Sequence, residues 1–265
     1  MDYFIKADCL RLSQTLFCGQ CFRFKETGEG LFSGVAGNRT VNLRQEKDGI
    51  TLLDAEESDI AYWENYFCAD MDYGAIMGDF SKDKTLAAAC ENPGIRVLRQ
   101  EPFETLISFI ISQNNNIKRI TGIVERLCEG FGEHLANGGY AFPTAQRLAA
   151  LTAEDLAPLR AGFRARYIID GAQKVASGQV DLEEICRLPA DEGRQKLMEI
   201  VGVGTKVADC VLLFGCGKWE VVPKDVWIKR IIAAYYPDGF PACMEKYGGI
   251  AQQYLFDYAR RGGVV

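Results

Sequence analysis

Near the N-terminus, short runs of β-forming residues alternate with polar turns. Within residues 22–54 the runs are FRF, LFSGV, RTVNL and ITLLD, and the pieces between them are ETGEG, AGN and EKDG. Such runs, bounded by turn residues, predict short strands, and the pair Asp48-Gly49 is a good hairpin signal. We therefore expect a β meander over residues 22–54.

Further along, the apolar spacing changes to the period of a helix. Residues 56–90 show this period weakly. Pro102 suits a first helical position, and one apolar face follows it: Phe103, Leu106, Ile107, Ile110 and Ile111. Three asparagines interrupt the pattern at 114–116, and a second face runs from Ile120 to Leu127 before Gly130. Further helices are expected at about 144–150, 153–159, 164–177, 192–200, 205–215, 225–235 and 244–260.

These patterns predict an α+β protein with a β-containing N-terminal domain over residues 1–93 and an all-helical region over 94–265. The chain has 265 residues, of which 48% are hydrophobic, enough for a buried core. No apolar run reaches the roughly 20 residues of a membrane helix, and the start MDYFIKADCLRL lacks a signal-peptide pattern. We therefore expect a soluble intracellular protein with no membrane partner.

The charge is unevenly distributed along the chain. The net charge of −6 argues weakly against a nucleic-acid partner. However, residues 1–93 hold 9 Lys and Arg against 16 Asp and Glu, whereas residues 94–265 hold 21 against 20. The local field at a binding face matters more than the total, so the helical region remains able to bind DNA.

The cysteines and the histidine limit the chemistry. The ten cysteines are scattered and do not predict a disulfide framework. Cys18 and Cys21 form a C-x-x-C pair, but the surrounding pattern is not the strand and helix of a thioredoxin-like site. His134 is the sole histidine and lies in a polar stretch, so a mechanism that needs a His triad is nearly excluded.

The stretch LMEIVGVGTKVADCVLLFG, residues 197–215, predicts two helices joined by a tight glycine turn. Gly202 and Gly204 permit positive φ and leave no side chain over the turn. Thr205 can cap the second helix, whose N-terminal amides can then bind a phosphate. This is the pattern of a helix-hairpin-helix, although any αα-hairpin with a glycine turn shares part of it.

Two residues near the hairpin suggest catalysis. Lys206 lies in the first turn of the second helix, where the helix dipole disfavours a cation and favours the neutral amine that a nucleophile needs. A surface Lys on a phosphate is the simpler interpretation. Asp225 follows Pro223 and can cap the next helix. A carboxylate there could also stabilise positive charge on a sugar, but the pattern alone does not bring it beside Lys206.

Four segments resemble the 8-oxoguanine DNA glycosylases of the helix-hairpin-helix-GPD superfamily. They are LISFIISQNNNIKRITGIVERLCEGFG (106–132), GFRARY (162–167), VGVGTKVADC (201–210) and VPKDV (222–226), and the resemblance reaches back to CGQCFRF (18–24). It implies two helical subdomains beside an N-terminal antiparallel sheet. It also implies an enzyme that flips the damaged nucleotide out of duplex DNA, for which a monomer is the default.

The resemblance assigns the chemistry and the base pocket. Lys206 would attack C1′ and form a Schiff base, with Asp225 assisting, so that the enzyme is both a glycosylase and an AP lyase. The backbone carbonyl of Gly19 would accept the N7–H that distinguishes 8-oxoguanine from guanine. Gln252 would read the Watson–Crick edge of the base. Phe256 would stack on one face of the base, and Cys210 would pack against the other.

The resemblance also assigns contacts to the rest of the duplex. Asn114 would fill the space that the flipped nucleotide leaves, and Phe163 would wedge into the base stack. Arg119 and Arg164 would hydrogen-bond the cytosine left behind. The hairpin would bind DNA through Gly202, Gly204 and Val207, and a local basic strip would consist of Lys118, Arg119, Arg160, Arg164, Arg166, Lys224, Lys229 and Arg230.

The chain departs from the family pattern in places. Lys224 and Trp227 stand where the pattern V-D-V-H has Val and His, so a phosphate contact is lost or passes to Lys224. Phe163 is often Tyr. The end RRGGVV lacks the C-x6-C-x2-C-x5-C run of an iron–sulfur cluster, so we expect no cluster and no required cofactor. The family's hairpin can hold a cation on backbone carbonyls, here those of Met198, Ile200 and Val203.

The leading hypothesis is a bifunctional glycosylase/AP lyase whose partner is duplex DNA containing 8-oxoguanine. Three alternatives stay open: a glycosylase of the same fold for another damaged base, a non-catalytic helix-hairpin-helix module, and a C-x-x-C oxidoreductase. A prokaryotic cytoplasm (nucleoid) and a nucleus both fit the sequence.

Overall fold

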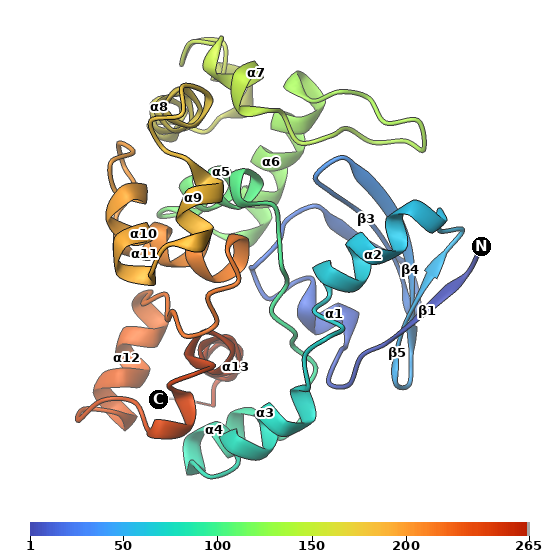
Figure 1. The fold of residues 1–265 in the computed structure, drawn as a ribbon, viewed down its shortest axis with the longest axis vertical. Coiled ribbons are helices and arrows are strands. Elements are labelled where there is room, and N and C mark those ends of the chain that lie inside the picture. Colours follow the sequence, from blue (N-terminus) through green and yellow to red (C-terminus); the bar gives the residue numbers. More distant parts are fainter. Residues whose placement is uncertain (264–265) are drawn as a thin grey trace.

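The computed structural model describes residues 1–263. Five strands form an antiparallel sheet in the order β1-β5-β4-β3-β2. They are β1 (Tyr3–Lys6), β2 (Phe24–Gly28), β3 (Leu31–Ala36), β4 (Arg39–Glu46) and β5 (Gly49–Leu53). The sheet lies on one side of the molecule, and the C-terminal helices lie on the other (Figure 1). The predicted α+β class with an N-terminal antiparallel sheet is confirmed.

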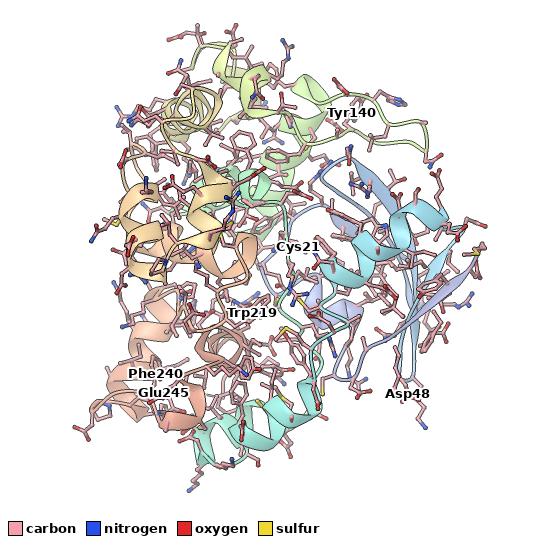
Figure 2. All side chains as sticks on the ribbon, viewed as in Figure 1. Cys21, Asp48, Tyr140, Trp219, Phe240 and Glu245 are labelled. Atoms are coloured by element: carbon pink, nitrogen blue, oxygen red, sulfur yellow. A yellow bond between two sulfur atoms is a disulfide. The ribbon has the colours of Figure 1, made fainter. Side chains whose placement is uncertain are left out.

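The meander expected over residues 22–54 is formed by β2 to β5. Glu46 pairs with Gly49, so the hairpin turn consists of Lys47 and Asp48, with Asp48 at its tip (Figure 2). Gly49 begins β5 and pairs with Lys6. The position requires glycine, because a Cβ there would overlap the carbonyl oxygen of Ile5 on the neighbouring strand. The hairpin prediction is therefore confirmed, with the turn one residue earlier.

The helical region follows the predicted order. The helices are α1 (Leu12–Thr15), α2 (Glu57–Tyr66), α3 (Tyr73–Phe80), α4 (Lys84–Ala89), α5 (Pro102–Ser112), α6 (Ile117–Phe131), α7 (Ala145–Ala149), η1 (Ala157–Leu159), α8 (Arg164–Ala176), α9 (Leu182–Arg187), α10 (Ala190–Leu197), α11 (Thr205–Cys210), η2 (Val211–Gly215), α12 (Val226–Tyr235), η3 (Ala242–Met244) and α13 (Gly248–Arg260). The elements η1 and η3 are 3₁₀ turns, and η2 is a π-helical turn that continues α11.

Two hydrophobic cores hold the fold. One lies between the sheet and α2, where Leu43, Ile50, Leu52 and Trp63 are buried. The other joins the remaining helices and already includes Tyr73 of α3. The two cores do not separate at one position of the chain, since Phe22 belongs to the second core and Leu98 to the first. The helix α4 packs against α13 (Figure 1).

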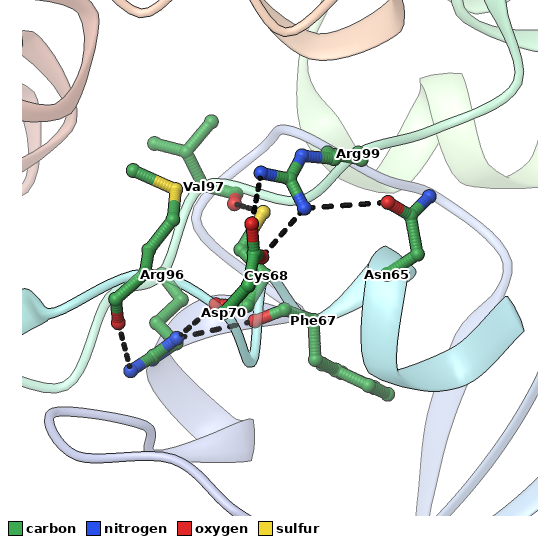
Figure 3. A network of polar contacts seen from close by, with 8 residues as sticks. Asn65, Phe67, Cys68, Asp70, Arg96, Val97 and Arg99 are labelled. Atoms are coloured by element: carbon green, nitrogen blue, oxygen red, sulfur yellow. Dashed lines mark hydrogen bonds and ion pairs between the residues drawn. The ribbon is translucent and has the colours of Figure 1, made fainter. Parts of the chain in front are cut away.

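A buried arginine ties the two parts together. Arg96 is 2% exposed, and its guanidinium donates to the carbonyl of Asp8 at 2.8 Å. It also donates to the carbonyls of Cys68 at 2.5 Å and Met71 at 3.3 Å (Figure 3). Backbone carbonyls satisfy the donors of a buried charge, as burial requires. Arg96 thereby ties the segment between α4 and α5 to the turn after β1 and to the turn between α2 and α3.

Candidate active site

The predicted hairpin is formed by α10, the residues 198–204 and α11. Gly202 has a φ of +83°, and a Cβ there would overlap the ring of Tyr167. Gly204 is the N-cap of α11, and no side chain among residues 1–263 caps this end. The prediction that Thr205 caps the helix is wrong: Thr205 is already the first helical residue, and its hydroxyl contacts the sulfur of Met198 at 4.0 Å. The first amides of α11 are thus open to an external acceptor.

A cavity of about 860 Å³ opens beside the hairpin, between the loop that joins α5 to α6 and the start of α12. Lys206 and Asp225 both line it, so the fold brings the two candidate catalytic residues to one cavity. Gly19, Asn114, Val207 and Phe256 lie in the same wall. A second cavity, of about 850 Å³ against β2 to β4, contains neither of the candidate catalytic residues.

Lys206 is half-buried and rests against α5. Its Nζ lies 3.4 Å from the hydroxyl oxygen of Ser112 and 5.0 Å from the centre of the Phe109 ring. The Ser112 hydroxyl donates in turn to the carbonyl of Phe109 at 2.8 Å, which leaves its oxygen free to accept from the lysine. Ser112 is a site residue that the sequence analysis misses, because the contact joins residues 94 apart.

Asp225 is the N-cap of α12 and accepts the amide N–H of Ile228 at 2.8 Å, which confirms the predicted cap. Both charged groups lie near the thiol of Cys210. Burial raises the pKa of Cys210 to about 11, while the Lys206 charge opposes and the Asp225 charge adds to that shift. The candidate nucleophile and carboxylate therefore share the surroundings of one buried side chain.

Gly19 is fixed by its neighbour Gln20. Gly19 has a φ of +95°, and Gln20 is 1% exposed. The Gln20 amide donates to the carbonyls of Thr15 at 2.9 Å and Arg96 at 2.8 Å, and its oxygen accepts the N–H of Leu98 at 2.9 Å. Every polar group of this side chain is engaged, so the segment beside the cavity is held rigidly. Sequence analysis quotes CGQCFRF but assigns Gln20 no role, since its partners become visible only in the fold.

The residues expected around a flipped base divide into two groups. Phe256 of α13 is half-buried and lines the cavity, with the Arg260 guanidinium 5.5 Å from its ring centre. Gln252, one turn earlier, is 4% exposed, and its oxygen accepts from Gln253 at 2.9 Å. Gln252 and Cys210 are 4% and 2% exposed and are not among the residues that line the cavity.

The residues expected to fill the vacated space, wedge into the stack and contact the opposite cytosine lie in the loop before α6, in α6 and at the start of α8. Asn114 is exposed and has a φ of +47°. Phe163 is 46% exposed at the start of α8, unusual for a large apolar side chain. Arg119 is exposed, but Arg164 is 2% exposed and bonded to backbone carbonyls. Arg164 therefore differs from the exposed Arg119, because folding buries the first turn of α8 against the asparagine loop.

The cavity carries a local positive charge. Its lining has five cationic side chains, Lys118, Lys206, Lys224, Lys229 and Arg260, against one carboxylate, Asp225. The cavity therefore has a local charge opposite in sign to the net charge of −6, as the binding of a polyanion requires. Exposed Val226 and Trp227 stand at the rim, the latter where the family pattern has His.

The sequence analysis predicts a cation site on the backbone carbonyls of the hairpin. The Ile200 carbonyl already accepts the amide of Val203 at 3.0 Å. A carbonyl oxygen has a second lone pair, so this bond does not by itself occupy the Ile200 oxygen fully, and the cation site stays a prediction. Among residues 1–263, no group of three or more His, Cys, Asp or Glu side chains could hold a metal ion.

The cysteines do not form a redox site at the C-x-x-C pair. Burial raises the pKa of Cys18 to about 12 and that of Cys21 well above its ordinary value. A reactive dithiol needs the opposite, a lowered pKa and access. The structure does contain a disulfide that the spacing does not predict, between Cys186 of α9 and Cys216 after η2, whose Cα atoms lie 4.7 Å apart.

No helix of residues 1–263 is long and apolar enough to cross a bilayer.

Comparisons with known proteins agree with this geometry. The family model for the 8-oxoguanine DNA glycosylase N-terminal domain matches residues 3–106, and that for the HhH-GPD superfamily base excision DNA repair proteins matches residues 107–239. The N-glycosylase/DNA lyase OGG1 of Arabidopsis thaliana is 31% identical over 96% of this chain and 74% of its own. The N-glycosylase/DNA lyase of Saccharomyces cerevisiae is 41% identical over 54% of this chain, which spans 42% of the yeast protein.

Two solved structures share nearly the whole fold. MBOgg1 in complex with a low-affinity DNA ligand is 40% identical, with a TM-score of 0.91 over 99% of this chain and 96% of its own. The 8-oxoguanine glycosylase/lyase of Clostridium acetobutylicum, in complex with duplex DNA containing cytosine opposite 8-oxoguanine, is 34% identical, with a TM-score of 0.90 over 100% and 99%. The chain therefore belongs to the 8-oxoguanine DNA glycosylase family of the HhH-GPD superfamily of base excision DNA repair proteins.

Proposed function

We propose that this protein is a bifunctional DNA glycosylase/AP lyase that excises 8-oxoguanine from duplex DNA. The observation that carries the proposal is the amine of Lys206 and the carboxylate of Asp225 in one cationic cavity beside a helix-hairpin-helix. The names of the yeast, plant and clostridial relatives, which are N-glycosylase/DNA lyases or an 8-oxoguanine glycosylase/lyase, support both activities.

Lys206 is the proposed nucleophile. Its neutral amine attacks C1′ of the flipped nucleotide, the bond from C1′ to the base breaks, and the bonding electrons leave with the base. The nitrogen gives one proton to the departing base. Its lone pair then forms the C1′=N bond of the Schiff base as the C1′–O4′ bond breaks, and O4′ takes up the second nitrogen proton. Loss of a C2′ proton and departure of the 3′ oxygen break the strand, which is the lyase step. Ser112 holds the amine at 3.4 Å before attack and can accept a hydrogen bond from it.

Asp225 is the proposed electrostatic partner. As the bond to the base lengthens, positive charge develops on the sugar, and a fixed carboxylate stabilises it. The cap bond to Ile228 holds the carboxylate in place without the cost of reorganisation during the reaction.

Lesion recognition is proposed to use the cavity wall. The Gly19 carbonyl accepts the N7–H of 8-oxoguanine, whereas guanine would present a lone pair to a lone pair. Phe256 stacks on the base, Gln252 reads its Watson–Crick edge, and Cys210 packs its other face. Because Gln252 and Cys210 are buried, contact between the base and these two side chains requires neighbouring side chains to move.

Duplex binding is proposed to use the hairpin and the loop before α6. The open amides of α11 hold a phosphate next to Gly202, Gly204 and Val207. Exposed Phe163 wedges into the stack, and Asn114 fills the vacated space. The enzyme acts as a monomer on the DNA of its cell, in a nucleoid or a nucleus. It needs no cofactor in the chemical steps, and a cation on the hairpin carbonyls would only stiffen the phosphate site.

Release of the free base from defined duplexes tests the proposal. The protein is incubated with separate duplexes carrying 8-oxoguanine opposite cytosine, an alkylated purine, an oxidised pyrimidine or adenine in a mispair, and the released base is identified by mass spectrometry. We expect release of 8-oxoguanine in preference to the others. Preferred release of another base would replace the substrate while keeping the enzyme class. Binding without release from any duplex would point to a non-catalytic module.

A further inference from the structure

The carbonyl oxygen of Gly19 is open to a ligand. Gly19 lines the cavity together with Lys206 and Phe256. Among residues 1–263, no N–H or O–H group donates to its carbonyl oxygen. The side chains beside it are occupied, since the Cys18 thiol donates to a backbone carbonyl at 3.3 Å and the Gln20 amide is hydrogen-bonded through both its nitrogen and its oxygen. The turn therefore presents a free acceptor at the cavity wall.

The direction of this carbonyl follows from the N–H in the same peptide. The peptide between Gly19 and Gln20 is planar and trans, so its C=O and N–H point to opposite sides. Burial raises the pKa of the Cys18 thiol to about 12, and a hydrogen bond from the backbone N–H of Gln20 to the sulfur opposes this shift. Cys18 is 5% exposed and does not line the cavity. The Gly19 carbonyl therefore points away from the buried sulfur, toward the side where Gly19 lines the cavity.

Gly19 does not hold this direction by itself. Glycine restricts its own backbone less than any other residue. A side chain is excluded here, because Gly19 has a φ of +95° and a Cβ would lie 3.3 Å from Cδ1 of Ile117. The carbonyl must therefore be fixed by the residues around it.

Gln20 is the neighbour that supplies this restraint. Its side-chain amide donates to the carbonyls of Thr15 at 2.9 Å and Arg96 at 2.8 Å, and its side-chain oxygen accepts the N–H of Leu98 at 2.9 Å. Its backbone carbonyl accepts the side-chain amide of Gln100 at 2.8 Å. These bonds hold Gln20 between the end of α1 and the segment that leads to α5, on a side chain that is 1% exposed.

We propose, on the basis of the function proposed above, that Gln20 is a positioning residue for lesion recognition, whose buried side chain holds the Gly19 carbonyl where it accepts the N7–H of 8-oxoguanine. Gln20 does not line the cavity, so it acts on the base through Gly19. Its effect is therefore confined to the steps in which the base is still attached to the sugar. Strand cleavage at an abasic site, which has no base, does not need it.

The test compares two reactions of the same active site. One duplex carries 8-oxoguanine opposite cytosine, and the rate of base release is measured in a single turnover. The other carries a preformed abasic site opposite cytosine, and the rate of strand cleavage is measured. The variants are Gln20→Met, which keeps the length of the side chain but loses its hydrogen bonds, and Gln100→Ala, which removes the bond to the Gln20 carbonyl. Thermal unfolding reports whether each variant folds.

Gln45→Met is the matched control. Gln45 also joins backbone groups that are distant in the sequence, since it accepts the N–H of Leu12 at 2.6 Å and donates to the carbonyls of Leu10 at 3.0 Å and Gly49 at 3.1 Å. It does not line the cavity. Its loss should lower the melting temperature and leave the ratio of the two rates unchanged.

We expect Gln20→Met to release 8-oxoguanine about tenfold or more slowly than the wild type, because a displaced acceptor loses one hydrogen bond to the base. Strand cleavage at the abasic site should keep the wild-type rate. Gln100→Ala should show a smaller loss of base release and the same unchanged cleavage. If Gln20→Met does not fold, Gln100→Ala carries the comparison.

Equal losses in the two reactions would overturn the inference, because Gln20 would then only stabilise the fold. Wild-type base release in the folded variants would overturn it as well. A wild type that cleaves the abasic duplex but releases no 8-oxoguanine would instead contradict the proposed function, so the two failures are distinguishable.

Discussion

At the scale of single residues, Asp225 combines two tasks that can be separated by substitution. Its oxygen caps α12 at 2.8 Å from the Ile228 amide, and its charge faces the cavity that Lys206 lines. An Asn side chain caps a helix about as well as Asp but carries no charge, whereas Ala does neither.

We predict that Asp225→Asn keeps its stability and loses about 100-fold or more in the rate of base release, because fixed charge at a developing cation is worth several kcal/mol. Asp225→Ala should lose the same activity and, in addition, about 1 kcal/mol of the free energy of unfolding. Single-turnover excision and denaturant unfolding measure the two effects. Wild-type rates in Asp225→Asn would mean that the carboxylate only caps.

The sequence indicates some of the candidate site residues and misses others. The sequence indicates Lys206 and Asp225 as candidates because their local pattern has a mechanism, and the fold brings both to one cavity. Ser112 and Gln20 are missed because their roles rest on partners about 80 to 94 residues away or on backbone groups of other segments. The burial of Arg164 is not visible in the sequence either, since a charged residue at a helix start shows nothing of the carbonyls that will surround it.

At the scale of elements, the hairpin depends on two glycines for different reasons. Gly202 has a positive φ and lies against the Tyr167 ring, so a side chain there is excluded by the fold. Gly204 has a φ of −99°, and a Cβ there would meet nothing within 4 Å. A side chain at Gly204 would instead stand beside the open amides of α11.

We therefore predict that Gly202→Ala lowers both the melting temperature and DNA affinity, whereas Gly204→Ala lowers DNA affinity with little change in melting temperature. Strain at a positive φ costs about 1–3 kcal/mol, which a thermal melt detects in the first variant. Binding to an undamaged duplex measures the second effect. Unchanged affinity in Gly204→Ala would show that phosphate does not approach this turn.

The elements that the pattern predicts best are the long ones with a clear period. α5 and α6 begin and end within a residue or two of the expected positions, and their apolar faces are buried. β1 is missed because its four residues pair with β5, about 45 residues further along. α9 is missed because six residues are too short for a period, although Asp181 caps it through the amides of Glu183 and Glu184.

At the scale of the whole molecule, the acidic chain has a cationic cavity. Five cations and one carboxylate line it, although the total charge is −6. The sequence predicts the direction of this asymmetry, because the excess of acid lies before residue 94. Only the fold shows that Lys118, Lys224 and Arg260, from three different segments, surround the same opening.

We predict that DNA affinity falls steeply with salt, with a slope of log K against log salt of about −3 to −5. Lys224→Gln should reduce the magnitude of that slope by about 1. Lys25→Gln, on the exposed face of β2, should leave it unchanged and serves as the control. Fluorescence anisotropy between about 50 and about 200 mM salt measures the slope. A flat dependence would contradict the assignment of this cavity to a polyanion.

Borohydride trapping tests the central claim most directly. The protein and Lys206→Gln are each mixed with a labelled duplex carrying 8-oxoguanine opposite cytosine, and with an undamaged duplex, in the presence of borohydride. We predict a covalent protein–DNA band that requires both the lesion and Lys206, because reduction fixes the Schiff base to that nitrogen. A band of equal strength in Lys206→Gln, or base release by the wild type with no band at all, would contradict the account.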